Sequence, residues 1–166
     1  CKMELTPDEL RDAITAVVPG HVCSPLLVLT GGEPFLQITQ SLLHEMTHYW
    51  NAGPRQPYGT VAIETNGTVM PSFHIPPSVW ITVSPKGDPS HILLPRVNEL
   101  RVVLAPGIDP YVYWDVLPDD FVLGGRRFIQ PCDGPNGPNI AEAVQYVKDH
   151  PGWRLGLQTH KLIGEK

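Results

Sequence analysis

The sequence has little of what marks a disulfide-rich or membrane protein. Its three cysteines, Cys1, Cys23 and Cys132, are too far apart for a compact metal motif or a paired disulfide framework. A reducing compartment, the cytoplasm, is therefore expected. No uninterrupted apolar run reaches the roughly 18 to 20 residues that a membrane-spanning helix needs, so we expect no membrane partner.

Charge of either sign is also scarce. Only 17% of the 166 residues are charged, and the formal net charge is -5. Nucleic acids and anionic membranes are bound by clustered Lys and Arg, which this sequence lacks, so both are excluded as partners. A small polar molecule remains a possible substrate. Proline, with 19 residues, and glycine, with 15, are abundant instead and predict many loops.

The most informative stretch is Leu-Leu-Val-Leu-Thr-Gly-Gly-Glu-Pro-Phe, residues 26–35. Its four apolar residues predict a buried strand that ends in a loop. Because Gly31 and Gly32 carry no side chain, main-chain groups of residues 30–33 can approach a polar ligand and adopt positive φ. Pro34 suits the first turn of a following helix. A plain tight turn is an equally good interpretation, whereas a phosphate loop is excluded by the missing lysine and glycine spacing.

Helices and strands alternate along the chain. A first helix is predicted after Thr6, with Pro7 at its first position and the Glu9 carboxylate three residues after the cap. Further helices are predicted over residues 37–50 and 139–149, the latter capped by Asn139. Strands are predicted over residues 26–29, 60–63, 79–83, 99–104, 127–129 and 153–157.

This alternation predicts an α/β fold with a parallel sheet, in a single domain over residues 1–166. Three helices for about six strands are too few for a complete eightfold barrel. The proline-rich residues 71–77 are expected to replace one helix as a crossover. Ligands of such sheets bind at the carboxyl ends of the strands. We therefore expect a site distributed over the loops that follow the strands.

Polar side chains follow several of these strands. Glu64 ends an apolar strand, where a carboxylate needs an amine, hydroxyl or cation as partner, although the Asn-Gly that follows also fits a simple turn. The Ser84 hydroxyl and the Lys86 ammonium could bind a carboxylate of a ligand. The commoner alternative is that Lys86 is simply a solvent-exposed lysine. Gln130 and Asp133 flank a proline at a third strand end, where a plain turn is the alternative.

Two histidines at helical spacing raise the alternative of a metal site. His44-Glu45-Met46-Thr47-His48 matches the H-E-x-x-H pattern of zinc proteases, in which both histidines bind the ion and the glutamate is the base. No later ligand is evident and the pattern is short, so a chance match is the preferred interpretation. His160, after the last strand, is either a donor to a ligand heterocycle or a surface residue.

Six segments, taken together and in order, resemble those of 7-carboxy-7-deazaguanine synthases, which are radical S-adenosylmethionine (SAM) enzymes of queuosine and other 7-deazapurine biosynthesis. The segments are Thr-Gly-Gly-Glu-Pro at 30–34, Glu-Thr-Asn-Gly at 64–67, Ser-Pro-Lys at 84–86, Asn-Glu-Leu at 98–100, Gln-Pro-Cys-Asp-Gly at 130–134 and the stretch from Trp-Arg-Leu at 153–155 through Gln-Thr-His-Lys at 158–161. The resemblance implies a partial, reduced (β/α) barrel of the radical SAM type with few helices.

The resemblance also implies a lyase reaction, the ring contraction of 6-carboxy-5,6,7,8-tetrahydropterin to 7-carboxy-7-deazaguanine with loss of ammonia. It implies SAM, a [4Fe–4S] cluster and Mg²⁺ as cofactors, a flavodoxin-type reductant and a homodimer. The residues implied at SAM are Gly31, Gly32 and Glu33 at its amine, Glu64 at its ribose, Ser84 and Lys86 at its ribose or carboxylate, and Gln130, Pro131, Cys132 and Asp133 at its adenine. Those implied at the pterin are Thr30, His160 and Lys166, the last through its terminal carboxylate.

One part of the family pattern, a C-x-x-x-C-x-x-C cluster motif before the first helix, has no counterpart in the sequence. Cys1 lies too close to the helix after Thr6 to count as a ligand, so we expect no cluster or magnesium ligand in this chain. The expectation is an N-terminally truncated domain whose first strand and cluster loop are missing. The alternative is a catalytically inactive relative that binds a ligand or partner. An exposed sheet edge beside residues 26–29 predicts poor solubility.

Overall fold

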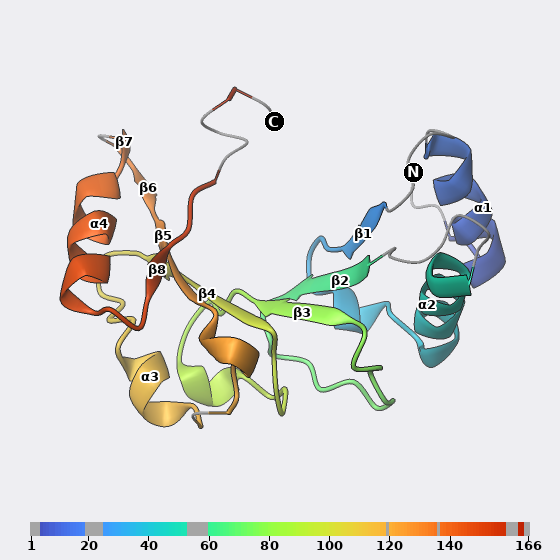
Figure 1. Cartoon of the computed structure of the whole chain (residues 1–166), viewed down its shortest axis with the longest axis horizontal. Helices are drawn as coiled ribbons and strands as arrows, with labels where there is room; N and C mark the ends of the chain where they lie inside the picture. Colours follow the sequence, from blue (N-terminus) through green and yellow to red (C-terminus); the bar gives the residue numbers. More distant parts are fainter. Residues whose placement is uncertain are drawn as a thin grey trace. The chain divides into compact units, whose positions relative to one another are not determined.

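The structure is a computed structural model that describes residues 4–18, 25–52, 60–118, 120–135, 137–158 and 163–164 (Figure 1). Its main sheet has the strand order β1-β2-β3-β4-β5-β8, and β6 and β7 form a separate hairpin. The pairs β1–β2, β3–β4, β4–β5 and β5–β8 are parallel. The predicted fold class, α/β with a parallel sheet and few helices, is confirmed.

The chain divides into two compact units within strand β3. The first unit, Cys1–Thr65 and Val69–Ile81, holds α1 (Pro7–Val17), β1 (Leu26–Leu29), the 3₁₀ turn η1 (Pro34–Leu36), α2 (Gln40–Ala52), β2 (Thr60–Thr65) and the start of β3 (Trp80–Val83). The second unit, Asn66–Thr68 and Thr82–Lys166, holds the end of β3, η2 (Pro89–His91), β4 (Glu99–Leu104), α3 (Val112–Val116), η3 (Leu123–Gly125), β5 (Arg127–Pro131), β6 (Asp133–Gly134), β7 (Gly137–Pro138), α4 (Ile140–Asp149) and β8 (Arg154–Leu155).

Helices α1 and α2 lie side by side in the first unit (Figure 1). α1 begins with a capping box: the Thr6 N–H donates to the Glu9 carboxylate at 2.8 Å, and the Glu9 N–H donates to Thr6 Oγ1 at 3.3 Å. The bonds from Thr6 lower the pKa of the Glu9 carboxyl. An ion pair joins the two helices, with Arg11 Nη1 2.5 Å from Glu45 Oε1. The helix start predicted at Thr6 is confirmed.

Strand β1 is less buried than its four apolar residues predict. Leu26 is 62% exposed and Val28 is 39% exposed. β1 stands at the end of the strand order and pairs with β2, where Leu29 lies opposite Ile63. Among the residues that the structure describes, no further strand covers its outer edge. The expectation of a buried strand is therefore wrong for β1, while Ile63 on its inner neighbour is 0% exposed.

The second unit is built on the parallel strands β3, β4, β5 and β8. Leu104 at the end of β4 pairs with Pro131 at the end of β5, and Ile129 pairs with Leu155 on β8. Helix α4 packs on β5 and β8 (Figure 1). The side chains that form the core are fully buried: Val83, Val97, Leu100, Val102 and Ile129. Each contributes about 1.5–3 kcal/mol of hydrophobic stabilisation, so this core fixes the strand ends that carry the predicted site.

The ends of several elements differ from the predicted ones. Pro34 begins the short turn η1, and α2 begins only at Gln40, after Thr39 Oγ1 accepts the Leu42 N–H at 3.2 Å. β5 continues to Pro131, and β8 is shorter than residues 153–157. α3 and the β6–β7 hairpin have no counterpart among the predicted elements, because such short segments show no measurable period.

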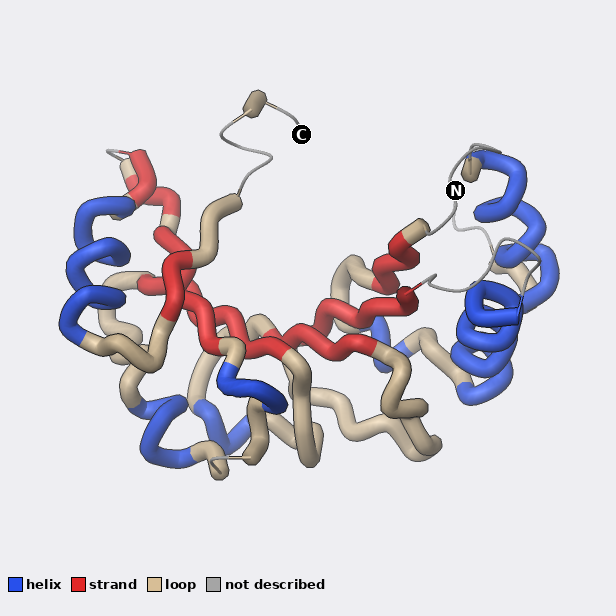
Figure 2. The backbone as a smooth tube through the Cα atoms, in the orientation of Figure 1, coloured by secondary structure: helices blue, strands red, loops and turns tan. Residues whose placement is uncertain are grey.

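The connection from β2 to β3 contains neither helix nor strand, as the proline-rich residues 71–77 predict (Figure 2). Prolines lack the N–H that a helix interior requires, which explains why this crossover stays irregular. None of the helices in the described part of the chain is long and apolar enough to cross a membrane.

Candidate functional site

In the first unit, the carboxylate of Glu33 is held against the end of β2. Its Oε1 accepts the hydroxyl hydrogen of Thr65 at 2.7 Å and the backbone N–H of Phe35 at 3.2 Å. Thr65 is the last residue of β2 and only 3% exposed. Two donors on one carboxylate oxygen fix its direction at the point where β1 and β2 both end.

Gly31 and Gly32, just before Glu33, adopt positive φ angles of 93° and 56°. A Cβ built at either glycine would meet no atom within 4 Å. The two glycines are therefore required for the backbone conformation, which side chains disfavour, and not for space. Both are exposed, as is Thr30. The loop accordingly presents its main-chain polar groups to solvent beside an oriented carboxylate.

Glu64 precedes Thr65 on β2 and is half-buried. Successive side chains of a strand point to opposite faces of the sheet. The Glu64 carboxylate and the Thr65 hydroxyl therefore leave β2 on opposite sides. The structure brings Thr65 to Glu33, and the role of Glu64 at the SAM ribose stays a prediction.

In the second unit, the loop after β3 carries Ser84 and Lys86 and is anchored from α3. The hydroxyl of Tyr113, a residue only 1% exposed, donates to the Gly87 carbonyl. Burial raises the pKa of Tyr113 and the Asp88 carboxylate adds to the effect, so the hydroxyl keeps its proton. Ser84 is half-buried and Lys86 is exposed. The Lys86 ammonium thus extends from a loop with a fixed backbone.

At the end of β5, Gln130 and Cys132 are half-buried, Pro131 is buried and Asp133 is exposed. Asn139 holds this segment, because its Oδ1 accepts the Cys132 N–H at 2.7 Å and its Nδ2 donates to the last carbonyl of β4 at 2.9 Å. Asn139 does stand at the N-cap position of α4, but its side chain makes no cap hydrogen bond to that helix. The predicted cap position of Asn139 is therefore confirmed, while its side chain bonds to the two strand ends and not to the helix backbone.

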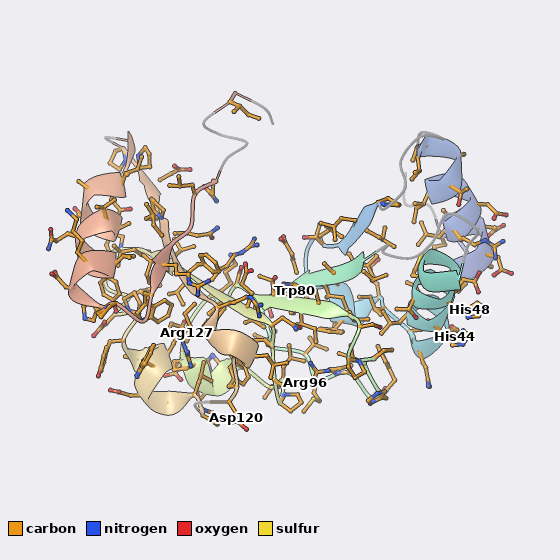
Figure 3. The ribbon with its side chains drawn as sticks, in the orientation of Figure 1. His44, His48, Trp80, Arg96, Asp120 and Arg127 are labelled. Atoms are coloured by element: carbon orange, nitrogen blue, oxygen red, sulfur yellow. The ribbon has the colours of Figure 1, made fainter. Side chains whose placement is uncertain are left out.

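His44 and His48 project side by side from α2 (Figure 3). Both are exposed, and their rings are stacked with centroids 5.7 Å apart. Glu45, between them in sequence, accepts instead from Arg11 on α1 at 2.5 Å. Within the described ranges, no group of three or more His, Cys, Asp or Glu side chains could hold a metal ion. The zinc-protease pattern gains no support from the structure.

His160 and Lys166, two of the residues predicted at the pterin, lie outside the described residues, as do Cys1 and Cys23. Their roles stay predictions. The roles of Thr30, Gly31 and Gly32 also stay predictions, although the backbone geometry of their loop is compatible with them.

Three residues that fix these loops were not predicted to do so. Thr65 follows Glu64 at the end of β2, and this position at a strand end was the sequence signal that Thr65 could contact a ligand-binding loop. Asparagine is typical of helix caps, so the sequence pointed to the backbone of α4 as the partner of the Asn139 side chain, which instead bonds to Cys132 and Leu104. Tyr113 carries no local signal, because its partner Gly87 is 26 residues away in the chain.

Comparison with known proteins connects these loops to one family. No protein-family model matches the chain. A 7-carboxy-7-deazaguanine synthase from Bordetella pertussis is 42% identical over 159 residues, which are 93% of this chain and 66% of the relative. Another from Bradyrhizobium diazoefficiens is 36% identical over 159 residues, 94% of this chain and 67% of the relative. This chain belongs to the 7-carboxy-7-deazaguanine synthase family.

The family membership confirms the resemblance inferred from the strand-end segments. The chain spans about two thirds of the length of the curated synthases that it matches. Among solved structures, the crystal structure of QueE from Escherichia coli is similar, with a TM-score of 0.66 and 21% identity over 93% of this chain and 64% of that chain. This similarity shows that the two chains share a fold.

Proposed function

We propose that this chain catalyses the reaction for which its relatives are named, the formation of 7-carboxy-7-deazaguanine. The substrate in this proposal is 6-carboxy-5,6,7,8-tetrahydropterin, and ammonia is released, which makes the enzyme a radical SAM lyase of queuosine and other 7-deazapurine biosynthesis. Membership of the synthase family, at 36% to 42% identity over more than nine tenths of the chain, supports the proposal. The comparisons give no support to the alternative of an inactive binding relative.

The observation that carries SAM binding is the oriented carboxylate of Glu33 beside the two positive-φ glycines. An ammonium group is bound best by several oxygen acceptors, because it has three N–H donors and no acceptor of its own. The exposed loop of Gly31 and Gly32 offers backbone carbonyls, and Glu33 offers a carboxylate whose direction is set by the Thr65 hydroxyl at 2.7 Å. This set of oxygen acceptors fits the methionyl amine of SAM.

The remaining proposed contacts to SAM come from three strand ends. Glu64 would bind the ribose, and Ser84 with Lys86 would bind the ribose or the carboxylate. The segment from Gln130 to Asp133 would line the adenine, and Asn139 fixes its backbone. The pterin would be bound by Thr30, His160 and Lys166.

SAM, bound at a reduced [4Fe–4S] cluster, supplies the carbon radical that begins the chemistry in enzymes of this kind. The described residues contain no group of three or more side chains that could bind a metal ion, so we assign them neither cluster nor Mg²⁺ ligands. Their part is to bind SAM and the pterin and to fix their orientation. A flavodoxin-type reductant, a homodimer, a cytoplasmic location and one radical SAM core domain over residues 1–166 complete the proposal.

Anaerobic reconstitution with iron and sulfide, of the chain joined to an N-terminal segment that carries the C-x-x-x-C-x-x-C motif, tests the proposal. After incubation with SAM, Mg²⁺, a reductant and the pterin, we expect mass spectrometry to detect 7-carboxy-7-deazaguanine. Glu33→Gln should lower both SAM affinity and product formation. Glu45→Gln is the matched control, because this carboxylate of the same unit pairs with Arg11 on α1. A wild-type chain that neither takes up a cluster nor cleaves SAM would contradict the proposal.

A further inference from the structure

The side-chain amide of Asn139 connects three segments of the second unit. Its Oδ1 accepts the Cys132 N–H at 2.7 Å, and its Nδ2 donates to the Leu104 carbonyl at 2.9 Å and to Glu142 Oε2 at 3.1 Å. Its backbone N–H donates to the Cys132 carbonyl at 3.1 Å. An amide nitrogen has two hydrogens to donate, so both donors of this side chain are used.

The two backbone groups that Asn139 binds lie at the ends of neighbouring parallel strands. Leu104 is the last residue of β4 and pairs with Pro131, the last residue of β5; Cys132 comes next. Beyond that pair the ladder ends, and backbone groups at this point need other partners. Asn139 supplies one acceptor and one donor there, and so joins the two strand ends through a side chain.

The same residue closes the base of the β6–β7 hairpin. Asp133 pairs with Pro138 in that hairpin, so Cys132 and Asn139 flank it directly. Both the N–H and the carbonyl of Cys132 are bonded to Asn139. Asn139 therefore fixes the backbone of Cys132, within the segment from Gln130 to Asp133, through its side chain and its own backbone N–H.

We propose that Asn139 is a positioning residue that fixes the Gln130–Asp133 segment for binding the adenosine part of SAM. This inference rests on the proposed function, since it concerns the same cofactor. The requirement is specific for asparagine. Aspartate keeps the acceptor but has no N–H for the Leu104 carbonyl, alanine has neither group, and glutamine places both one methylene further out.

The test compares Asn139→Ala and the nearly isosteric Asn139→Asp with the wild-type chain. S-adenosylhomocysteine, which keeps the adenosine of SAM, is the probe, and its affinity is measured by titration calorimetry. Hydrogen exchange of the Cys132 amide is followed in the same samples. We expect both variants to bind the probe at least tenfold more weakly. Asn139→Ala should also exchange the Cys132 amide at least tenfold faster, because its acceptor is lost.

Two controls separate positioning from general stability. Glu142→Gln removes the charge of an exposed partner and keeps the two strand-end bonds of Asn139, so the probe affinity should not change. Thr6→Ala removes the cap of α1 in the first unit and should lower the melting temperature without changing the probe affinity. Asn139→Asp keeps the test valid if Asn139→Ala does not fold.

The outcomes distinguish the inference from the function on which it rests. A wild-type chain that does not bind S-adenosylhomocysteine contradicts SAM binding, and the inference fails with it. If the wild type binds the probe and both folded Asn139 variants bind it equally well, the inference alone is wrong. Weaker binding by both variants, with unchanged binding by the two controls, supports it.

Discussion

Replacing Thr65 with valine removes one hydroxyl and leaves the shape of the side chain almost unchanged. The hydroxyl donates to Glu33 Oε1 at 2.7 Å, and Thr65 is only 3% exposed. Phe35 N–H, at 3.2 Å, continues to donate to the same oxygen. The substitution therefore tests whether the direction of the Glu33 carboxylate, and not merely its presence, matters for the ligand.

The expected effect on stability is small. A hydrogen bond to a charged group contributes about 1.5–3 kcal/mol to the free energy of unfolding. Burying a methyl group in place of the hydroxyl offsets about 0.8 kcal/mol of this loss. A net loss of about 1 kcal/mol lowers the melting temperature of a protein of this length by about 2–4 °C.

We expect the substitution to reduce SAM affinity more clearly than it reduces stability. A carboxylate that has lost the Thr65 donor offers a less well fixed acceptor to the SAM amine, and the loss of one bond to that amine, about 1.4 kcal/mol, weakens binding about tenfold. Calorimetric titration with SAM measures this, and circular dichroism measures the melting temperature. Thr47→Val is the matched control, because the Thr47 hydroxyl is also buried and bonds to the Leu43 carbonyl within α2.

A Thr65→Val chain that melts 2–4 °C lower but binds SAM as tightly as the wild type would refute the reasoning. The carboxylate would then be oriented by other contacts. Equal weakening by Thr47→Val would also refute it, since the effect would follow general destabilisation of the unit.

Three further predictions concern the other loops and the aromatic cluster. Gly32→Ala should lower the free energy of unfolding by about 1–2 kcal/mol through backbone strain and should weaken SAM binding. Gly107→Ala is the control: this glycine also has a positive φ and nothing within 4 Å, so the variant should lose as much stability but bind SAM unchanged. Chemical denaturation measures the stability of both variants, and calorimetry measures their SAM affinity. Tyr113→Phe should lower stability by about 1 kcal/mol and speed amide exchange in the loop of Lys86, and unchanged exchange would show that the loop is fixed by other contacts. Burial raises the pKa of Tyr146 to about 12 from 10.0, so its contribution to stability should be complete below pH 10 and should fall as the pH rises toward 12. Melting curves at alkaline pH should show a smaller fall for Tyr146→Phe. The same variant should lose little stability at neutral pH, because the buried hydroxyl has no hydrogen-bond partner among the described residues.

The sequence by itself determined the type and order of the main elements and where a site would lie. Thr6, Pro7 and Glu9 are close in sequence and act on one helix start, so their pattern predicted the capping box that the structure contains. Two adjacent glycines after an apolar run predicted the positive-φ loop, because few other residues adopt that backbone conformation. The six strand-end segments together identified the family.

Tertiary structure decided how deeply each strand is buried and what orients the site. The apolar run of β1 looks buried in sequence, but burial depends on what lies beside a strand, and Leu26 is 62% exposed. The partner of Glu33 is a hydroxyl 32 residues away, and that of Asn139 is a carbonyl 35 residues away. Such bonds depend on strand register and loop path, which no local pattern encodes. Local chemistry therefore located the loops, and long-range packing set the direction of the groups they present.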